Sequence, residues 1–177
     1  SKYQVVIPKP AREHLDLKPK QKLTVIEKDK MLILIPQSSL EDLKGIAVGA
    51  KIDGYREKKG SFLMIIVDSC GWLEWFTDGK LANKYRKYLA DQENLLMPAI
   101  ILYEVYKILK REVNEEKALL AVGYMKNAPV IPLNETLALS AADVALQENL
   151  AMADAIIVAT SRLYNCTIIS SDSDLKN

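Results

Sequence analysis

The chain has 177 residues, of which 49% are hydrophobic and 27% charged, which is enough to bury a core in one domain or in two small ones. The chain contains no run of 18 apolar residues, so we do not expect it to cross a membrane. Its first residues do not look like a signal peptide, and its two isolated cysteines do not form a disulfide framework, so we expect a cytoplasmic protein. The net charge of +1 is distributed unevenly along the chain. Residues 1–63 carry 13 Lys and Arg against 8 Asp and Glu, whereas residues 64–177 carry 11 Lys and Arg against 15 Asp and Glu. This difference favours two modules, of which the basic first one could bind nucleic acid.

Residues 1–44 predict a small β-rich domain, because short apolar runs alternate with polar and proline-containing turns. The expected elements are a strand at 4–7, a short helix from Pro10 to about Leu15, strands at 22–27 and 31–35, and a helix capped at 38–41 and ended by Gly45. Only the polar residues 28–30 separate the second and third strands, so these two are expected to form a hairpin.

Residues 45–63 have the composition of a linker or a wrapping arm. Four of the seven glycines of the chain lie between Gly45 and Gly60, and the charged run 55–59 lies in the same stretch. We therefore expect this segment to separate the domain 1–44 from a second domain at 64–177.

From Met64 onward the signals for strands and helices alternate, which is typical of a parallel sheet covered by helices. The expected strands are 64–67, 95–97, 130–133 and 167–170, and the expected helices are 71–76, 80–91, 100–112, 115–126, 134–147 and 153–164. The apolar run that ends at Val67 reads as a strand buried on both faces. Asp68 then lies at its carboxyl end, the edge of an open α/β sheet where ligands collect.

Four carboxylates are expected at or just beyond this edge: Asp68, Glu104, Asp154 and Asp172. Taken singly, each has a structural explanation. Asp68 could be a helix N-cap and Glu104 part of a solvated helix face. Asp154 could complement the helix dipole, and Asp172 could be a turn residue. Their coincidence on one edge favours a joint role, because crowded like charges are costly unless a cation neutralises them. Oxygen ligands alone suit a hard ion, Mg²⁺ or Mn²⁺.

The segments VDSCGWLEWF, PAIILYEV, LAMADAIIVATS and TIISSDSDL resemble the PIN-domain ribonucleases, over residues 64–177. The resemblance implies a parallel sheet flanked by helices and a site that binds one or two divalent ions and cleaves RNA, with tRNA as one candidate substrate. The implied metal ligands and catalytic residues are Asp68, Glu104, Asp154 and Asp172. Asp174 is a weaker candidate, and Ser170 or Ser171 occupies the position of a hydroxyl residue common before the last acid. Ala99 departs from the family, where many members have serine or threonine, and the family usually continues into a final strand beyond the position of Asn177.

The segment KYQVVIPKPAREHLDLKPKQKLTVIEKDKMLILIP resembles the AbrB-type swapped-hairpin DNA-binding domain. The resemblance implies an intertwined homodimer or higher homo-oligomer that grips operator DNA through Lys2, Lys9 and Arg12. Tyr3 replaces the usual glycine of the motif.

Together the two halves resemble a VapBC toxin–antitoxin pair in one chain, with the antitoxin first. Antitoxins of this kind block their toxins with an arm, which implies an inhibitory role for Tyr55 and Arg56. Arginine is well shaped to bind carboxylates.

Three hypotheses about function follow. The first is a metal-dependent endoribonuclease, in which a metal-bound water attacks the phosphodiester and the antitoxin half both inhibits the enzyme and binds its operator. The second is a DNA-binding repressor whose PIN-like half is a silent dimerisation module. The third, a phosphatase with Asp68 as nucleophile, usually needs a second aspartate two residues later, where this chain has Cys70. The phosphate-binding motifs GxxxxGK[ST] and GxGxxG do not occur.

Overall fold

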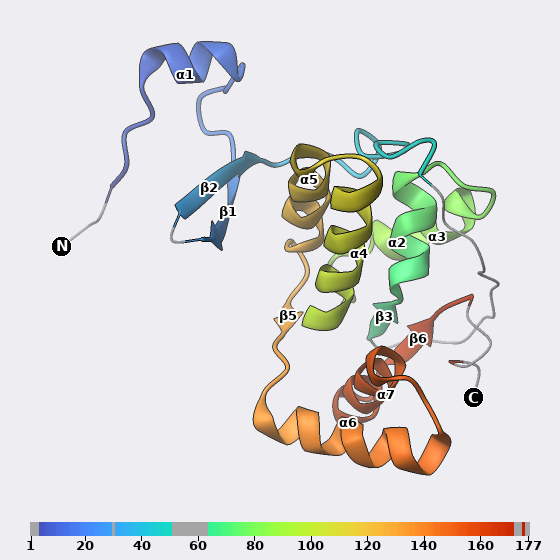
Figure 1. Ribbon diagram of the computed structural model, residues 1–177. Coiled ribbons are helices and arrows are strands. Elements are labelled where there is room, and N and C mark those ends of the chain that lie inside the picture. The colour runs from blue at the N-terminus through green and yellow to red at the C-terminus, as the bar shows by residue number, and fades with distance from the viewer. Residues whose placement is uncertain (1–3, 30, 51–63, 172–174, 176–177) are drawn as a thin grey trace.

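The computed structural model describes residues 4–29, 31–50, 64–171 and Leu175, and shows an N-terminal hairpin module beside an α/β domain (Figure 1). The elements are α1 (Lys9–His14), β1 (Leu23–Lys28), β2 (Met31–Pro36), β3 (Ile65–Val67), α2 (Ser69–Phe76), α3 (Ala82–Leu89), β4 (Met97–Pro98), α4 (Ala99–Glu112), α5 (Glu115–Met125), β5 (Val130–Ile131), α6 (Glu135–Glu148), α7 (Met152–Tyr164) and β6 (Thr167–Ile169). Among these helices, none is both long enough and apolar enough to span a membrane.

The α/β domain has the parallel sheet that the sequence predicts. β3 pairs in parallel with β6, and β4 pairs in parallel with β5. A parallel bridge between Ile65 and Leu95 connects the two pairs, so that the strand order is β6-β3-β4-β5. All three residues of β3 are buried, as a strand covered on both faces should be.

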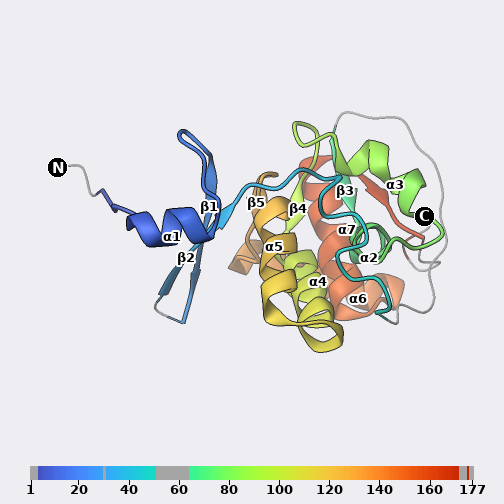
Figure 2. The same cartoon turned by 90° about the horizontal axis from the view of Figure 1, so that it is seen from above.

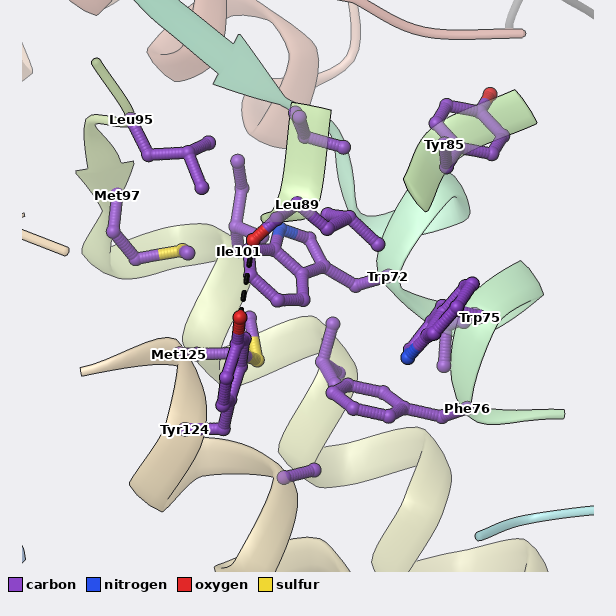
Figure 3. Close-up of a cluster of buried hydrophobic side chains, with 14 of the residues drawn as sticks. Trp72, Trp75, Phe76, Tyr85, Leu89, Leu95, Met97, Ile101, Tyr124 and Met125 are labelled. Atoms are coloured by element: carbon purple, nitrogen blue, oxygen red, sulfur yellow. Dashed lines mark hydrogen bonds between the residues drawn. The ribbon is translucent and has the colours of Figure 1, made fainter. Parts of the chain in front are cut away.

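The core of this domain is built around α2, which buries seven of its eight residues. Figure 3 shows Trp72 and Phe76 of α2 among Leu89, Ile101 and Met125, which come from three other helices. The helix is therefore fixed on nearly all sides, and so is the end of β3 that leads into it.

The first predicted strand is wrong: residues 4–7 form no strand in the described structure. A strand needs an edge to pair with, and these residues find none within the described part of the chain. Val5 and Val6 remain 79% and 86% exposed. The short helix after them is confirmed as α1, which starts at Lys9.

The helix predicted after Ser38 is also wrong, because residues 40–49 form successive turns. Ser39 and Asp42 do exchange the two hydrogen bonds of a capping box, at 3.1 Å each. The amides that follow bond three residues back, Leu43 to the carbonyl of Leu40 at 3.2 Å and Lys44 to that of Glu41 at 3.1 Å, so the segment makes tight turns and not an α-helix. Gly45 and Gly49 take positive φ angles of 69° and 91°.

Residues 40–50, which we call the clasp, contact the α/β domain directly. Leu40, Leu43 and Ala47 are buried in its core. The indole nitrogen of Trp75 donates to the carbonyl of Leu40 at 2.8 Å, and the amide of Ala47 donates to the carbonyl of Phe76 at 2.6 Å. The first part of the expected linker is thus seated on the C-terminal half, whereas the domain limits 1–44, 45–63 and 64–177 stay predictions.

The predicted hairpin is confirmed, with each strand displaced or extended by one residue. β1 and β2 are antiparallel, from Leu23 opposite Pro36 to Lys28 opposite Met31. Both views place this hairpin beside α5, with α1 farther from the α/β domain (Figures 1 and 2).

Candidate functional site

Asp68 lies where β3 ends and α2 begins, and its side chain is held firmly. One carboxylate oxygen accepts from the amide of Ser69 at 2.6 Å, which caps α2, and the other accepts from the hydroxyl of Ser170 at 2.7 Å. The amide of Asp68 donates to the carbonyl of Ile169 on β6 at 3.1 Å. The sheet therefore fixes the backbone, and the two hydrogen bonds fix the orientation of the carboxylate.

Glu104 projects from the second turn of α4 and is half-buried. Burial is the main cause that raises the pKa of its carboxyl group; the negative charges of Asp68 and Asp154 raise it further, while a hydrogen bond with Ser69 and the charge of Lys107 lower it. Asp154 lies in the first turn of α7 and is also half-buried. The carboxylates of Asp68 and Asp154, from two other parts of the fold, thus both act electrostatically on Glu104.

The other predicted residues of this edge and of the arm lie outside the described residues. These are Asp172, Asp174, Tyr55 and Arg56, together with Lys2 of the DNA-binding set. Within the part of the chain that the structure describes, no three histidine, cysteine, aspartate or glutamate side chains are assembled closely enough to hold a metal ion as they stand. A complete ligand set would therefore need Asp172, a rearrangement of the carboxylates, or both.

Both serines after β6 lie near the Cys70 sulfur, Ser170 at 3.6 Å, but only Ser170 also bonds a carboxylate. Ser170 donates to Asp68, whereas Ser171 donates to the thiol of Cys70 at 3.3 Å. Burial, with the nearby charge of Asp68, raises the pKa of Cys70 to about 11. The thiol is therefore protonated near neutral pH and does not serve as a nucleophile.

Two side chains that border this site, Ser69 and Tyr85, carry no role predicted from the sequence. Ser69 bonds both Asp68 and Glu104, and Tyr85 of α3 places its hydroxyl 3.7 Å from the Cys70 sulfur. Ser69 follows Asp68 directly, which was an available signal. Tyr85 belongs to the apolar stripe of α3, and nothing in the sequence distinguishes it from its core neighbours.

The basic residues of the N-terminal half form a separate surface. Lys9 and Arg12 are exposed on α1, and Lys9 pairs with Glu13 at 3.6 Å. Arg12 also lines a shallow pocket together with Lys18 and Lys20. Cations grouped in this way fit a polyanion such as a DNA backbone.

The chemistry of the carboxylate donors fits a hard divalent ion. Asp68, Glu104 and Asp154 offer oxygen ligands only, as Mg²⁺ and Mn²⁺ prefer, and the like charges that meet at Glu104 are those that a cation would neutralise.

Two family models match this chain. Residues 65–177 match the PIN domain family. The chain belongs to the PIN-domain family. Residues 1–42 match the family described as "Antidote-toxin recognition MazE, bacterial antitoxin". An antitoxin-type domain followed by a PIN domain is the order that the sequence predicts.

Solved structures with the PIN fold are similar to this chain. A toxin–antitoxin complex from Klebsiella pneumoniae has a TM-score of 0.50 and 19% identity, over 59% of this chain and 82% of the other. The Mycobacterium tuberculosis protein VapC20, described as a sarcin-ricin loop cleaving toxin, has a TM-score of 0.52 and 16% identity, over 58% and 84%. A protein of Pyrobaculum aerophilum has a TM-score of 0.50 and 18% identity, over 64% and 77%. A search of curated proteins finds no match. At such identities these structures confirm the fold of the PIN domain.

Proposed function

We propose that this chain is a Mg²⁺-dependent endoribonuclease of the PIN family joined to its own antitoxin, which restrains the nuclease and binds operator DNA. The observation that carries the proposal is the placement of Asp68 at the carboxyl end of β3, where Ser69 and Ser170 hold its carboxylate, with the half-buried Glu104 of α4 close enough for the charges of Asp68 and Asp154 to act on it. Such convergence of carboxylates is typical of metal-dependent phosphodiester chemistry.

Asp68, Glu104, Asp154 and Asp172 would hold the ion, and Mn²⁺ could replace Mg²⁺. A bound divalent ion supplies an activated water and offsets negative charge on the phosphodiester. Ser170 and Ser69 keep the Asp68 carboxylate turned in one direction. Glu104, which is half-buried and harder to ionise than an exposed glutamate, would orient the attacking water or complete the ligand set.

RNA is the proposed substrate class. The PIN family match and the description of VapC20 as a toxin that cleaves an RNA loop support it. tRNA is one candidate, in keeping with a cytoplasmic nuclease.

Operator binding and dimerisation are assigned to the N-terminal half. Lys9 and Arg12, with Lys2, would contact the DNA, and Lys18 and Lys20 extend the same basic surface. The exposed residues 4–7 would find the strand partner that they lack by pairing with a second copy of the chain. Restraint of the nuclease is assigned to the arm, where Arg56 would enter the carboxylate cluster and Tyr55 would pack beside it.

The second candidate is a DNA-binding repressor whose PIN domain is catalytically silent. It is favoured by the two hydrogen bonds of the Asp68 carboxylate, because capping α2 and accepting from Ser170 give this side chain a structural role of its own. The same basic surface would serve it, and Asp68 would then be a helix cap only.

One experiment separates the two candidates. The full chain and its Arg56→Ala variant are incubated with total tRNA and Mg²⁺, with and without a chelator, and Mn²⁺ binding is followed by electron paramagnetic resonance. We expect Mn²⁺ binding, and cleavage by the variant that the chelator stops. A chain that binds operator DNA but neither Mn²⁺ nor RNA in any of these assays is the repressor.

A further inference from the structure

The hairpin is apolar on both faces, whereas a hairpin at the surface of a domain needs only one apolar face. Successive side chains of a strand point to opposite faces, so Ile26, Ile33 and Ile35 share one face. Val25, Leu32 and Leu34 share the other, and are 48%, 68% and 38% exposed. The two faces therefore call for two different partners.

The isoleucine face already has its partner within the chain. Ile26 and Ile35, 8% and 5% exposed, form a cluster with Val122 of α5, and Leu119 and Tyr106 pack around it. This cluster borders the main core, against which Tyr106 also packs, and none of its members belongs to the clasp. It joins the two halves of the chain at a place distant from the linker in sequence.

Gly123 shows that α5 is adapted to this contact. A glycine inside a helix costs about 1 kcal/mol relative to alanine, so it needs a reason. A Cβ atom at position 123 would lie 3.1 Å from the Cγ2 atom of Ile35, tighter than nearly all such contacts. The missing side chain thus lets β2 approach the helix backbone closely.

A polar network borders the apolar contact on one side. The ammonium of Lys28 forms an ion pair with Glu115 at the start of α5 and donates to the hydroxyl of Tyr106 at 2.7 Å. Tyr106 in turn donates to Glu115 at 2.7 Å, and Lys110 lies 3.1 Å from the same carboxylate. One residue of the hairpin is thereby bonded to both α4 and α5.

Two further bonds tie the opposite end of α5 to the hairpin. The side chain of Lys126 donates to the backbone carbonyl of Val25 at 3.0 Å. The side-chain amide of Gln37 donates to the side-chain oxygen of Asn127 at 2.8 Å. The contact therefore extends along the whole of α5.

We propose that the α4–α5 face of the PIN domain is a docking surface for the β1–β2 hairpin, which holds the DNA-binding half and the nuclease half together independently of the clasp and of residues 51–63. We call this contact, made by Ile26, Lys28, Ile35, Glu115 and Val122, the junction. The free face of the hairpin stays available to a second copy, so docking and dimerisation use different faces and do not compete. Each PIN domain would then be carried at a fixed position relative to the DNA-binding half. This inference does not require that the PIN domain be an active nuclease.

The test is hydrogen exchange of the full-length chain, read by mass spectrometry. Gly123→Leu places a side chain into the junction while giving α5 a better helix former. We expect amides of 23–28 and 31–35 to exchange about tenfold faster or more, because docking protects them, with α6 and α7 unchanged. Unchanged exchange in the hairpin of Gly123→Leu would overturn the proposal.

Two neighbouring substitutions in β2 give the matched control. Ile35→Thr removes an apolar side chain from the docking face, and Leu34→Thr removes one from the free face. Threonine keeps strand propensity in both variants. Only Ile35→Thr should speed exchange in α5, at residues 115–125. Equal effects of the two variants on α5 would contradict a face-specific dock.

Discussion

At the scale of single residues, Asp68 has two roles that the sequence could not separate. It caps α2, as a structural explanation requires, and it contributes charge to Glu104, as a functional site requires. These roles are compatible because one side chain has two oxygens with several lone pairs. A cap that is also held by Ser170 is better oriented than a cap alone needs to be.

Asp68→Asn should therefore abolish metal-dependent RNA cleavage without unfolding the protein. Asparagine caps helices as well as aspartate does, so α2 should remain, but one charged ligand is lost. We expect RNA cleavage to fall by more than about 100-fold. Mutating a residue that only hydrogen-bonds to a metal ligand already lowers metal affinity or activity by about 10–100-fold, and loss of a ligand itself should cost more. The assay compares Arg56→Ala with Arg56→Ala/Asp68→Asn, with circular dichroism as the control for folding. Full cleavage by a folded double variant would exclude Asp68 from the site.

Ser170→Ala tests the orientation of that carboxylate. The hydroxyl donates to Asp68 at 2.7 Å, so its loss should weaken Mn²⁺ binding by about 10–100-fold. Ser171→Ala is the matched control, because Ser171 donates to Cys70 and not to a carboxylate. Equal losses in both variants would indicate a general packing defect.

The site could be predicted from the sequence only in part. Asp68, Glu104 and Asp154 follow from strand ends and helix starts, because parallel strands bring their carboxyl ends to one edge. Tyr85 at the site and Gly123 at the junction could not be assigned in the same way. Their importance depends on which segment lies opposite, and that is set by tertiary packing.

At the scale of elements, local patterns were reliable for the helices of the PIN domain. The helices α4 to α7 lie within two residues of their predicted bounds, because periodic apolar stripes and caps such as Asn134 specify them. Residues 4–7 have an equally clear strand pattern but no pairing edge in the described chain. A strand is a property of two segments, so its pattern alone does not decide it.

The helix α1 should bind DNA through Lys9 and Arg12, and replacing both by alanine should weaken operator binding. Fewer counterions would be released, so the slope of log K against log salt should fall by roughly 2 per protomer. Lys84→Ala/Lys87→Ala on α3 is the control with the same change in charge. Electrophoretic mobility shifts at several salt concentrations measure both variants. An unchanged slope for the first pair would place the DNA elsewhere.

The junction should depend on pH through Glu115. Hydrogen bonds from Lys28, Tyr106 and Lys110 lower the pKa of this carboxyl group from 4.5 to about 2. Because the pKa of Glu115 is lower in the folded state than in the unfolded state, its ionised carboxylate stabilises the folded protein. This contribution is fully present above about pH 4.5 and is lost as the pH falls toward 2. Glu115→Gln should thus lower the free energy of unfolding at pH 7, and its difference from the parent should shrink between pH 4.5 and 2.

The effect of Glu115→Gln should be small, because the ion pair is partly exposed and screened by salt. Urea unfolding at pH 7, 5, 4 and 3 measures it, and Glu116→Gln, an exposed neighbour, is the control. A difference that does not change with pH would mean that the ion pair contributes nothing to docking.

At the scale of the whole molecule, two contact regions, the clasp and the junction, hold the two halves together in addition to the chain connection through residues 51–63. The clasp buries Leu40, Leu43 and Ala47 against α2, and the junction covers α5. Composition alone suggested a linker from Gly45, because glycine and charge mark flexible segments. Gly45 and Gly49 instead take positive φ angles in the tight turns of the clasp, where Leu40 and Ala47 bond Trp75 and Phe76. Cutting the chain at Met64 would therefore strip the clasp from the core of the PIN domain.

The arm is best tested in the intact chain for the same reason. Arg56 is proposed to enter the site where Asp68 and Asp154 raise the pKa of Glu104, since a guanidinium neutralises carboxylates in the way that a metal does. Arg56→Ala should then raise Mg²⁺-dependent cleavage of RNA by about tenfold or more, the change expected when one charge-assisted contact of about 1.5–3 kcal/mol is lost. Lys59→Ala, in the same charged run, is the control, because lysine lacks the planar pair of donors. Cleavage is measured with total tRNA, and a chelator must abolish the gain. If the parent chain already cleaves RNA as fast as Arg56→Ala, the arm does not restrain the nuclease, even though the clasp and the junction would still hold the two halves together.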